Sequence, residues 1–241
     1  MRLDKLLAHS GFGTRKEVKE LIKKGYVQVN NKIIKSDKTQ VDPQVDVIKV
    51  DDEVITYEEK VYYMLNKPAG YVSATEDNLH PTVVDLIDDY YRNDLFPVGR
   101  LDIDTEGLLI LTNDGVLAHQ LLSPKRHCPK IYYAKIKGVV TLEDIETFKN
   151  GVIIDNEYQC QSAILKILST DATESEIEVT IYEGKFHQVK KMFLAVGKEV
   201  KYLKRICMKN LILDENLELG EYRRLTDEEL DRLKDESMLQ L

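Results

Sequence analysis

The chain has 241 residues, of which 43% are hydrophobic and 32% charged, with only 12 Gly and 6 Pro. This composition is typical of a globular protein rather than a disordered one, and the length suits one sizeable domain plus a small one, or two modest domains. No apolar run is long enough to span a bilayer and the first residues lack the apolar core of a signal peptide, so we expect a cytoplasmic protein without a membrane segment. The three cysteines are widely spaced and predict neither a disulfide framework nor a metal site.

The net charge of -8 is unevenly distributed along the chain. Residues 1–35 contain nine Lys and Arg but only three Asp and Glu, a balance of +6, whereas the remainder is strongly acidic. A basic segment of this kind is typical of a part of the chain that binds nucleic acid. The overall charge therefore hides a basic N-terminal module.

The sequence of this module predicts two helices followed by a β-hairpin. Leu3, Leu6 and Leu7 give an apolar helical pattern that ends at the glycines of residues 11–13. Further along, apolar residues between 27 and 34 flank Asn30-Asn31, a pair that can adopt the positive φ angles of a tight hairpin turn. A second helix is expected between these two elements.

The second helix has clear start and stop signals. Thr14 and Glu17 have the spacing of a capping box, and Gly25 is placed to end the helix. Its expected buried stripe consists of Val18, Leu21 and Ile22.

Seven basic side chains of the module are candidate RNA-binding residues: Arg2, Lys5, Arg15, Lys16, Lys19, Lys23 and Lys24. The first turn of a helix disfavours cations, so helix stability does not explain why Arg15 and Lys16 are found there. A solvated lysine face is one interpretation and a phosphate-binding surface is the other, which we favour. The stretch from residue 1 to about 48 resembles an S4 domain, a small RNA-binding module, whose hairpin usually carries Gly where this chain has Asn31.

The acidic stretch from Asp51 to Lys60 is the expected linker, and a strand over Val61 to Leu65 opens the second part of the chain. From there to about residue 226, short β-rich runs alternate with a few helices, including segments 139–151 and 187–197. This pattern predicts an α+β fold with a mostly antiparallel mixed sheet. Residues 226–241 begin Thr-Asp-Glu-Glu and predict a capped terminal helix.

The most informative segment is residues 99–107, Gly-Arg-Leu-Asp-Ile-Asp-Thr-Glu-Gly, followed at once by an apolar strand. It presents a carboxylate, Asp102, at a turn close to the basic Arg100. The spacing of Asp102 and Asp104 superficially matches a calcium loop, but Asn113 stands where a bidentate Glu is required and a strand replaces the second helix. We therefore expect no metal here.

Three other segments accompany this one: Asn-Lys-Pro-Ala-Gly-Tyr at 66–71, Lys-Ile-Tyr at 130–132, and Glu-Gly-Lys-Phe-His-Gln-Val-Lys-Lys-Met at 183–192. Together with residues 99–107 they closely resemble the pseudouridine synthases of the RsuA type, and the resemblance covers nearly the whole chain. It implies conversion of a uridine within RNA to pseudouridine, an isomerisation that needs no cofactor. It also implies an S4-like RNA-binding domain and linker over 1–55 and a catalytic domain over 56–241.

Three residues match the family's catalytic positions. Asp102 matches the catalytic carboxylate, Lys190 its basic partner, and Tyr132 a tyrosine that lies against the target uracil. Strand alternation independently turns Tyr132 inward, although most inward tyrosines are plain core residues. Lys190 falls on the flank of its helix's apolar stripe, where a surface lysine is the alternative interpretation.

Four further residues are expected to bind the substrate: Arg100, Lys67, His187 and Gln188. Lys67 is the weakest of these, because Pro68 and Gly70 make a structural turn that explains its motif without a role in binding. Glu106 either places a second acid near the site or points to solvent.

The target is expected to be ribosomal RNA. Phe186-His187 and His127-Cys128 look like the small-subunit enzymes of the family, the 16S rRNA pseudouridine(516) synthases, whereas siblings that act on the large subunit typically have Asn-Arg in place of Phe186-His187. We expect a monomer that acts on 16S rRNA or a partly assembled small subunit. The alternatives are a large-subunit rRNA pseudouridine synthase and a non-catalytic S4-type ribosome-binding protein.

Overall fold

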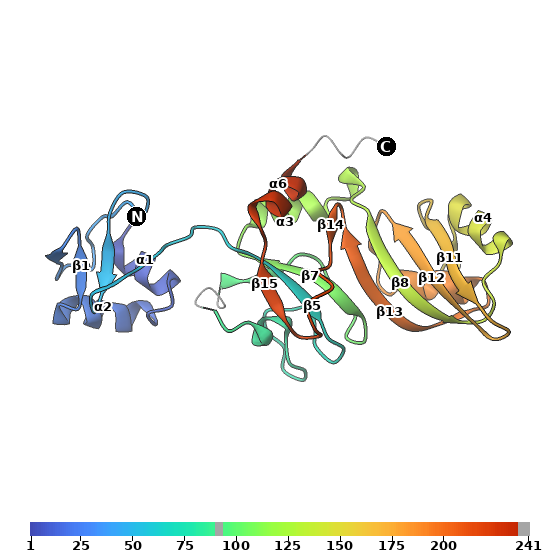
Figure 1. The fold of residues 1–241 in the computed structure, drawn as a ribbon, viewed down its shortest axis with the longest axis horizontal. Coiled ribbons are helices and arrows are strands. Elements are labelled where there is room, and N and C mark those ends of the chain that lie inside the picture. The colour runs from blue at the N-terminus through green and yellow to red at the C-terminus, as the bar shows by residue number, and fades with distance from the viewer. Residues whose placement is uncertain (90–93, 236–241) are drawn as a thin grey trace. The chain divides into compact units, whose positions relative to one another are not determined.

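The computed structural model describes residues 1–89 and 94–235, and the chain divides into two compact units (Figure 1). The first consists of Met1–Val61 with Ile87–Leu95, and the second of Tyr62–Leu86 with Phe96–Leu241. The division expected after residue 55 stays a prediction. Both units mix helices with mostly antiparallel sheets, so the predicted α+β class is confirmed.

The first unit packs two helices against a small sheet of strand order β2-β1-β3-β4. Its elements are α1 (Leu3–His9), α2 (Arg15–Lys24), β1 (Val27–Val29), β2 (Lys32–Ile33), β3 (Ile48–Val50) and β4 (Glu53–Val54). Apolar side chains from both helices and from β1 and β3 form one buried cluster. The predicted order of helix, helix and hairpin is confirmed.

Local signals explain these elements. Thr14 and Glu17 form the predicted capping box at the start of α2, and Gly25 ends the helix in the left-handed conformation. Asn30 and Asn31 have φ values of 51° and 61°, which allow the tight turn between β1 and β2. Two expectations were wrong in part. Leu21 is only half-buried on the edge of the stripe, and the stretch expected to be a linker contains β4, which pairs with β3.

The second unit is built on a nine-stranded sheet. The central path runs β11-β12-β8-β13-β7-β5-β15, with β14 added to β13 and β6 to β7. The strands are β5 (Tyr62–Lys67), β6 (Phe96–Pro97), β7 (Glu106–Thr112), β8 (Lys130–Lys137), β11 (Ile164–Thr170), β12 (Glu174–Ile181), β13 (Glu199–Met208), β14 (Leu211–Ile212) and β15 (Tyr222–Arg224). All neighbours are antiparallel except β13 and β7, which run parallel.

Helices and short turns cover this sheet. They are η1 (Val83–Leu86), α3 (Gly115–Leu122), η3 (Pro124–Arg126), α4 (Leu142–Asn150), α5 (Gln188–Ala195) and α6 (Asp227–Lys234), with a separate hairpin of β9 (Ile153–Ile154) and β10 (Tyr158–Gln159). Helices α3 and α6 lie side by side near β14, and α4 lies beside β11 at the far end (Figure 1). A buried cluster joins α3 and α6 to β5 and β7.

The helices expected in the second unit are found where the structure describes them. Helices α4 and α5 lie within the predicted segments, and Thr226 caps α6, although residues 236–241 of the predicted tail lie outside the described part. The three cysteines are buried and free. Within residues 1–89 and 94–235, no helix is both long and apolar enough to cross a membrane.

Candidate active site

Asp102 lies in the loop between β6 and β7, and backbone contacts hold this loop in place. The Leu101 N–H donates to the Ser73 hydroxyl at 3.0 Å, and that hydroxyl donates back to the Leu101 carbonyl at 3.0 Å. A turn follows, in which the Thr105 N–H donates to the Asp102 carbonyl at 3.0 Å. The carboxylate is therefore presented from a fastened turn rather than from a free loop.

Lys67, the last residue of β5, connects this strand to the turn through its side chain. Its side chain is fully buried, and its Nζ lies within hydrogen-bonding distance of four carbonyl oxygens: Pro68 at 3.0 Å, Asp102 at 3.1 Å, Ile103 at 3.3 Å and Thr105 at 2.8 Å. Burial lowers the pKa of Lys67 to about 8, against the opposing effect of the acidic groups in the turn. Lys67 therefore braces the backbone around Asp102, and it does not line the nearby cavity.

The Asp102 carboxylate faces helix α5. Lys190 Nζ lies 3.1 Å from Asp102 Oδ2 and 2.6 Å from Asp104 Oδ1, so one ammonium bridges two carboxylates. Burial alone would lower the pKa of Lys190, but its hydrogen bonds to Asp104 and Asp102 outweigh this and raise it. The pair thus places a carboxylate beside a cation, an arrangement that suits nucleophilic or base chemistry.

His187 also faces Asp102, with its Nε2 3.6 Å from Asp102 Oδ1. It precedes α5 in the left-handed conformation, with φ of 55°. The rings of His187 and Phe186 are stacked with centroids 3.7 Å apart, and Phe186 is 72% exposed. An exposed aromatic pair therefore stands beside the carboxylate.

Gln188 is buried and organises the segment before α5. Its Nε2 donates to Glu183 Oε1 at 3.0 Å, and its Oε1 accepts from the Lys185 N–H at 2.9 Å. Glu183 in turn accepts from the Tyr158 hydroxyl at 2.5 Å. These bonds fix the turn from which His187 and α5 emerge.

A cavity of about 690 Å³ opens in front of Asp102. Tyr132 lines it from β8 and is 7% exposed, which confirms the predicted inward orientation. Arg100 is exposed and lines the cavity as well. The structure thus gathers six of the seven predicted site residues around one cavity, namely Arg100, Asp102, Tyr132, His187, Gln188 and Lys190.

Two buried cations on the cavity wall were not predicted from sequence. Lys130 of β8 and Arg205 of β13 line the same cavity and are 8% and 2% exposed. Strand alternation was the signal that could have found Arg205, because Leu203 and Cys207 on either side are also buried. The carboxylate of Glu106 is half-buried and accepts a 2.7 Å hydrogen bond from the Tyr202 hydroxyl, and its charge acts on the buried Lys67, so a second acid near the site stays a prediction.

The seven basic residues of the first unit are distributed unequally. Six of them are exposed, namely Lys5, Arg15, Lys16, Lys19, Lys23 and Lys24, although Lys19 lies 3.5 Å from Asp37 and Lys23 lies 4.0 Å from Glu20. Arg2 is half-buried and forms an ion pair with Asp4 at 2.8 Å. The exposed members give this unit a surface suited to phosphate groups.

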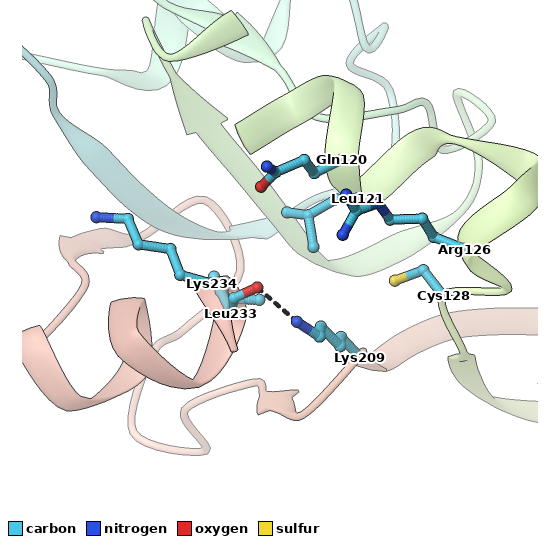
Figure 2. Close-up of a pocket in the computed structure, with 7 residues that line it drawn as sticks. All are labelled: Gln120, Leu121, Arg126, Cys128, Lys209, Leu233 and Lys234. Atoms are coloured by element: carbon cyan, nitrogen blue, oxygen red, sulfur yellow. Dashed lines mark hydrogen bonds between the residues drawn. The ribbon is translucent and has the colours of Figure 1, made fainter. Parts of the chain in front are cut away.

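A second cavity, of about 10 Å³, lies between α3, α6 and the end of β13 (Figure 2). Its lining residues are Gln120, Leu121, Arg126, Cys128, Lys209, Leu233 and Lys234. Lys209 Nζ donates to the Leu233 carbonyl at 2.7 Å and so ties α6 to the sheet. This space holds at most about one water molecule.

Among the described residues, no group of three or more His, Cys, Asp or Glu side chains could hold a metal ion.

Comparisons with known proteins agree with this arrangement. The family model for RNA pseudouridylate synthase matches residues 61–195, and the model for the S4 domain matches residues 1–47. The chain therefore belongs to the RNA pseudouridine synthases, and it is one that carries an S4 domain.

Full-length relatives define the type more closely. The chain is 50% identical to an uncharacterised RNA pseudouridine synthase, YtzG, of Bacillus subtilis, over 98% of this chain and 99% of the relative. It is 39% identical to ribosomal small subunit pseudouridine synthase A of Haemophilus influenzae, over 97% and 99% of the two chains. A crystal structure of a pseudouridylate synthase superposes with a TM-score of 0.69 at 37% identity, covering 97% of this chain and 99% of that one. The chain is thus an RsuA-type pseudouridine synthase.

Proposed function

We propose that Asp102 is the catalytic carboxylate with which this enzyme isomerises uridine. The observation that supports it is the ion pair between Asp102 and Lys190 at 3.1 Å, held at the edge of a cavity large enough for a nucleotide. In the reaction the bond from C1′ to N1 breaks, a bond from C1′ to C5 forms, and the proton lost from C5 is balanced by one gained at N1. A carboxylate fixed beside a cation can act on this substrate as nucleophile or base.

The other residues of the cavity have complementary roles in this proposal. Tyr132 stacks on the uracil, and Lys190 holds the Asp102 carboxylate in place through their ion pair. Arg100 and His187 hold the target nucleotide, which must leave its stack to reach Asp102. Gln188 and Lys67 act indirectly, because Gln188 braces the segment before α5 and Lys67 is buried beneath the catalytic turn.

We further propose that the substrate is small-subunit ribosomal RNA, at the uridine of position 516. Relatives at 38–39% identity over nearly their whole length carry the name ribosomal small subunit pseudouridine synthase A. Phe186-His187, the feature that distinguishes the small-subunit enzymes in the sequence, stands beside Asp102. In this proposal the exposed cations of the first unit bind rRNA phosphates, and the enzyme works as a cytoplasmic monomer.

The test is a comparison of substrates. Purified enzyme is incubated with 16S rRNA, a partly assembled small subunit and 23S rRNA, and pseudouridines are mapped by carbodiimide labelling and primer extension. The proposal expects a single new pseudouridine, at position 516, in the 16S rRNA or in the assembling subunit. A new pseudouridine only in 23S rRNA would replace the small-subunit assignment with the large-subunit alternative.

A further inference from the structure

Arg205 is an unusually placed cation. It lies on β13 directly opposite Tyr132 of β8, so the two side chains share one face of the sheet. It is 2% exposed and lines the same cavity as Asp102 and Tyr132. Arg205 therefore lines the cavity in front of Asp102 and is almost entirely closed to solvent.

The polar contacts of Arg205 leave part of its hydrogen-bonding capacity unused. Its Nε donates to the Leu108 carbonyl at 2.8 Å, but its buried Nη2 has no hydrogen-bond partner. Within residues 1–89 and 94–235, no carboxylate forms an ion pair with it. A buried donor without a partner is costly, and a buried charge without a counter-charge is more so.

A second buried cation lies beside it. Lys130 is 8% exposed, and its Nζ donates to the Cys128 carbonyl at 2.7 Å. Burial lowers the pKa of Lys130, and the positive charge of Arg205 acts in the same direction, which indicates that the two cations are close. The negative charge of Glu183 raises the pKa of Lys130, but the Glu183 carboxylate already accepts hydrogen bonds from Tyr158 and Gln188.

The position of Arg205 is fixed by the neighbouring strand. At Gly107, the second residue of β7, φ is +99°, and a Cβ would overlap the Arg205 carbonyl oxygen. Glycine thus lets β7 approach β13 closely, and the Leu108 carbonyl then holds the guanidinium. The donor is rigid before any ligand arrives, which is the condition for strong electrostatic stabilisation.

We propose that Arg205, supported by Lys130, binds the carbonyl oxygens of the target uracil and stabilises the negative charge that the base carries while it is detached. This inference rests on the proposed function. When the C1′–N1 bond breaks, its electron pair stays on the uracil ring and is shared with the ring carbonyl oxygens. The same electron pair then forms the C1′–C5 bond, the C5 proton is lost and N1 takes up a proton. A cation at the carbonyl oxygens therefore favours the intermediate state more than the bound uridine.

The test varies both the cation and the acidity of the base. Single-turnover rate constants for loss of the N1-linked target nucleoside are measured for wild type, Arg205→Met and Arg205→Lys, with nucleosides separated after digestion. The target is either uridine or 5-fluorouridine, and the latter stops at the C5-linked adduct because its C5 carries fluorine instead of a proton. Arg232→Met is the matched control, because Arg232 is exposed and pairs only with Glu228 among the ion pairs of the described chain. Each variant is also checked for its thermal midpoint and its RNA affinity.

The inference expects Arg205→Met to lower the rate on uridine about 100-fold, the usual effect of removing one preorganised donor, with RNA affinity changed less than about threefold. On 5-fluorouridine the loss should shrink to about tenfold, because fluorine itself stabilises the anionic ring. The Arg205→Lys variant should lie between wild type and Arg205→Met. Equal losses on both substrates by a folded variant, or no loss at all, would overturn the inference.

A wild-type measurement keeps the inference falsifiable if the variants do not fold. Free 5-nitrouracil, whose ring is ionised at neutral pH, should inhibit wild type at least tenfold more strongly than free uracil. Equal inhibition, or none by either base, would count against a cationic carbonyl site. If wild type makes no pseudouridine in any RNA, the proposed function fails; if it does and the Arg205 variants match it, only the present inference fails.

Discussion

Replacing Lys67 by Met should weaken the second unit and its catalysis together, although Lys67 is too deeply buried to touch RNA. Its Nζ has four carbonyl partners between 2.8 and 3.3 Å, three of them in the turn that carries Asp102. Hydrogen bonds to charged groups contribute about 1.5–3 kcal/mol each. The variant also removes a buried charge, and the desolvation cost that is relieved in this way offsets part of the lost hydrogen bonding. We expect a net destabilisation of about 2–4 kcal/mol.

The same change should slow the reaction without weakening RNA binding. A catalytic group displaced by about 1 Å typically costs about 100-fold in rate, and the turn around Asp102 loses its main anchor in Lys67→Met. The assays are the thermal midpoint, the single-turnover rate and the affinity for RNA. The control is Lys149→Met, an exposed lysine of α4 that pairs only weakly with Glu146 at 3.7 Å.

The pH dependence of stability supplies an independent check. The pKa of Lys67 is about 8 in the folded protein and near 10.5 in an unfolded chain, so between these values the unfolded state binds more protons. Stability of wild type relative to Lys67→Met should therefore rise from pH 8 to pH 10.5 and stay level below pH 8, where both states bind the proton. A variant as stable and as active as wild type, or a stability difference that falls with rising pH, would refute the bracing role.

Three further predictions concern separate parts of the molecule. Gly107→Ala should lower the thermal midpoint strongly, because its Cβ would overlap the facing strand, whereas Gly115→Ala, with open space and no positive φ, should not. Tyr132→Ala should reduce the single-turnover rate about 10-fold more than Tyr132→Phe, because only the alanine variant loses the stacking ring; equal effects would contradict stacking. Replacing Lys16 and Lys24 together by Ala should lower the slope of log affinity against log salt by about 1.5, and an unchanged slope would exclude phosphate contacts there.

Much of the fold follows from short-range signals in the sequence. The capping box of Thr14 and Glu17 and the turn at Asn30-Asn31 are local, and the structure contains both. Alternation in β8 likewise turns Tyr132 inward, because a strand with one buried face leaves no other choice. The strand β4 was missed, since a two-residue partner of β3 in an acidic segment has no pattern of its own.

The site was less accessible to sequence reasoning, because its key contacts join distant segments. Lys67 and Asp102 are thirty-five residues apart, and only the pairing of β5 with β7 brings the ammonium to the turn that carries Asp102. Because Lys67 precedes Pro68, the sequence predicts that it begins a turn, and turns usually lie at the surface. The burial of Lys67 could therefore not be predicted. Arg205 follows other basic residues and reads as exposed unless the alternation of Leu203 and Cys207 is given more weight than its charge.

The measurement that tests the central claim most directly is pseudouridine mapping of small-subunit rRNA from cells that lack this protein. The cells are complemented with wild type, with Asp102→Asn or with Asp104→Asn, a matched change at the other carboxylate bonded to Lys190. The account predicts a modification that disappears on deletion, returns with wild type and with Asp104→Asn, and stays absent with Asp102→Asn. A modification restored equally by Asp102→Asn would contradict the assignment of Asp102 as the catalytic carboxylate.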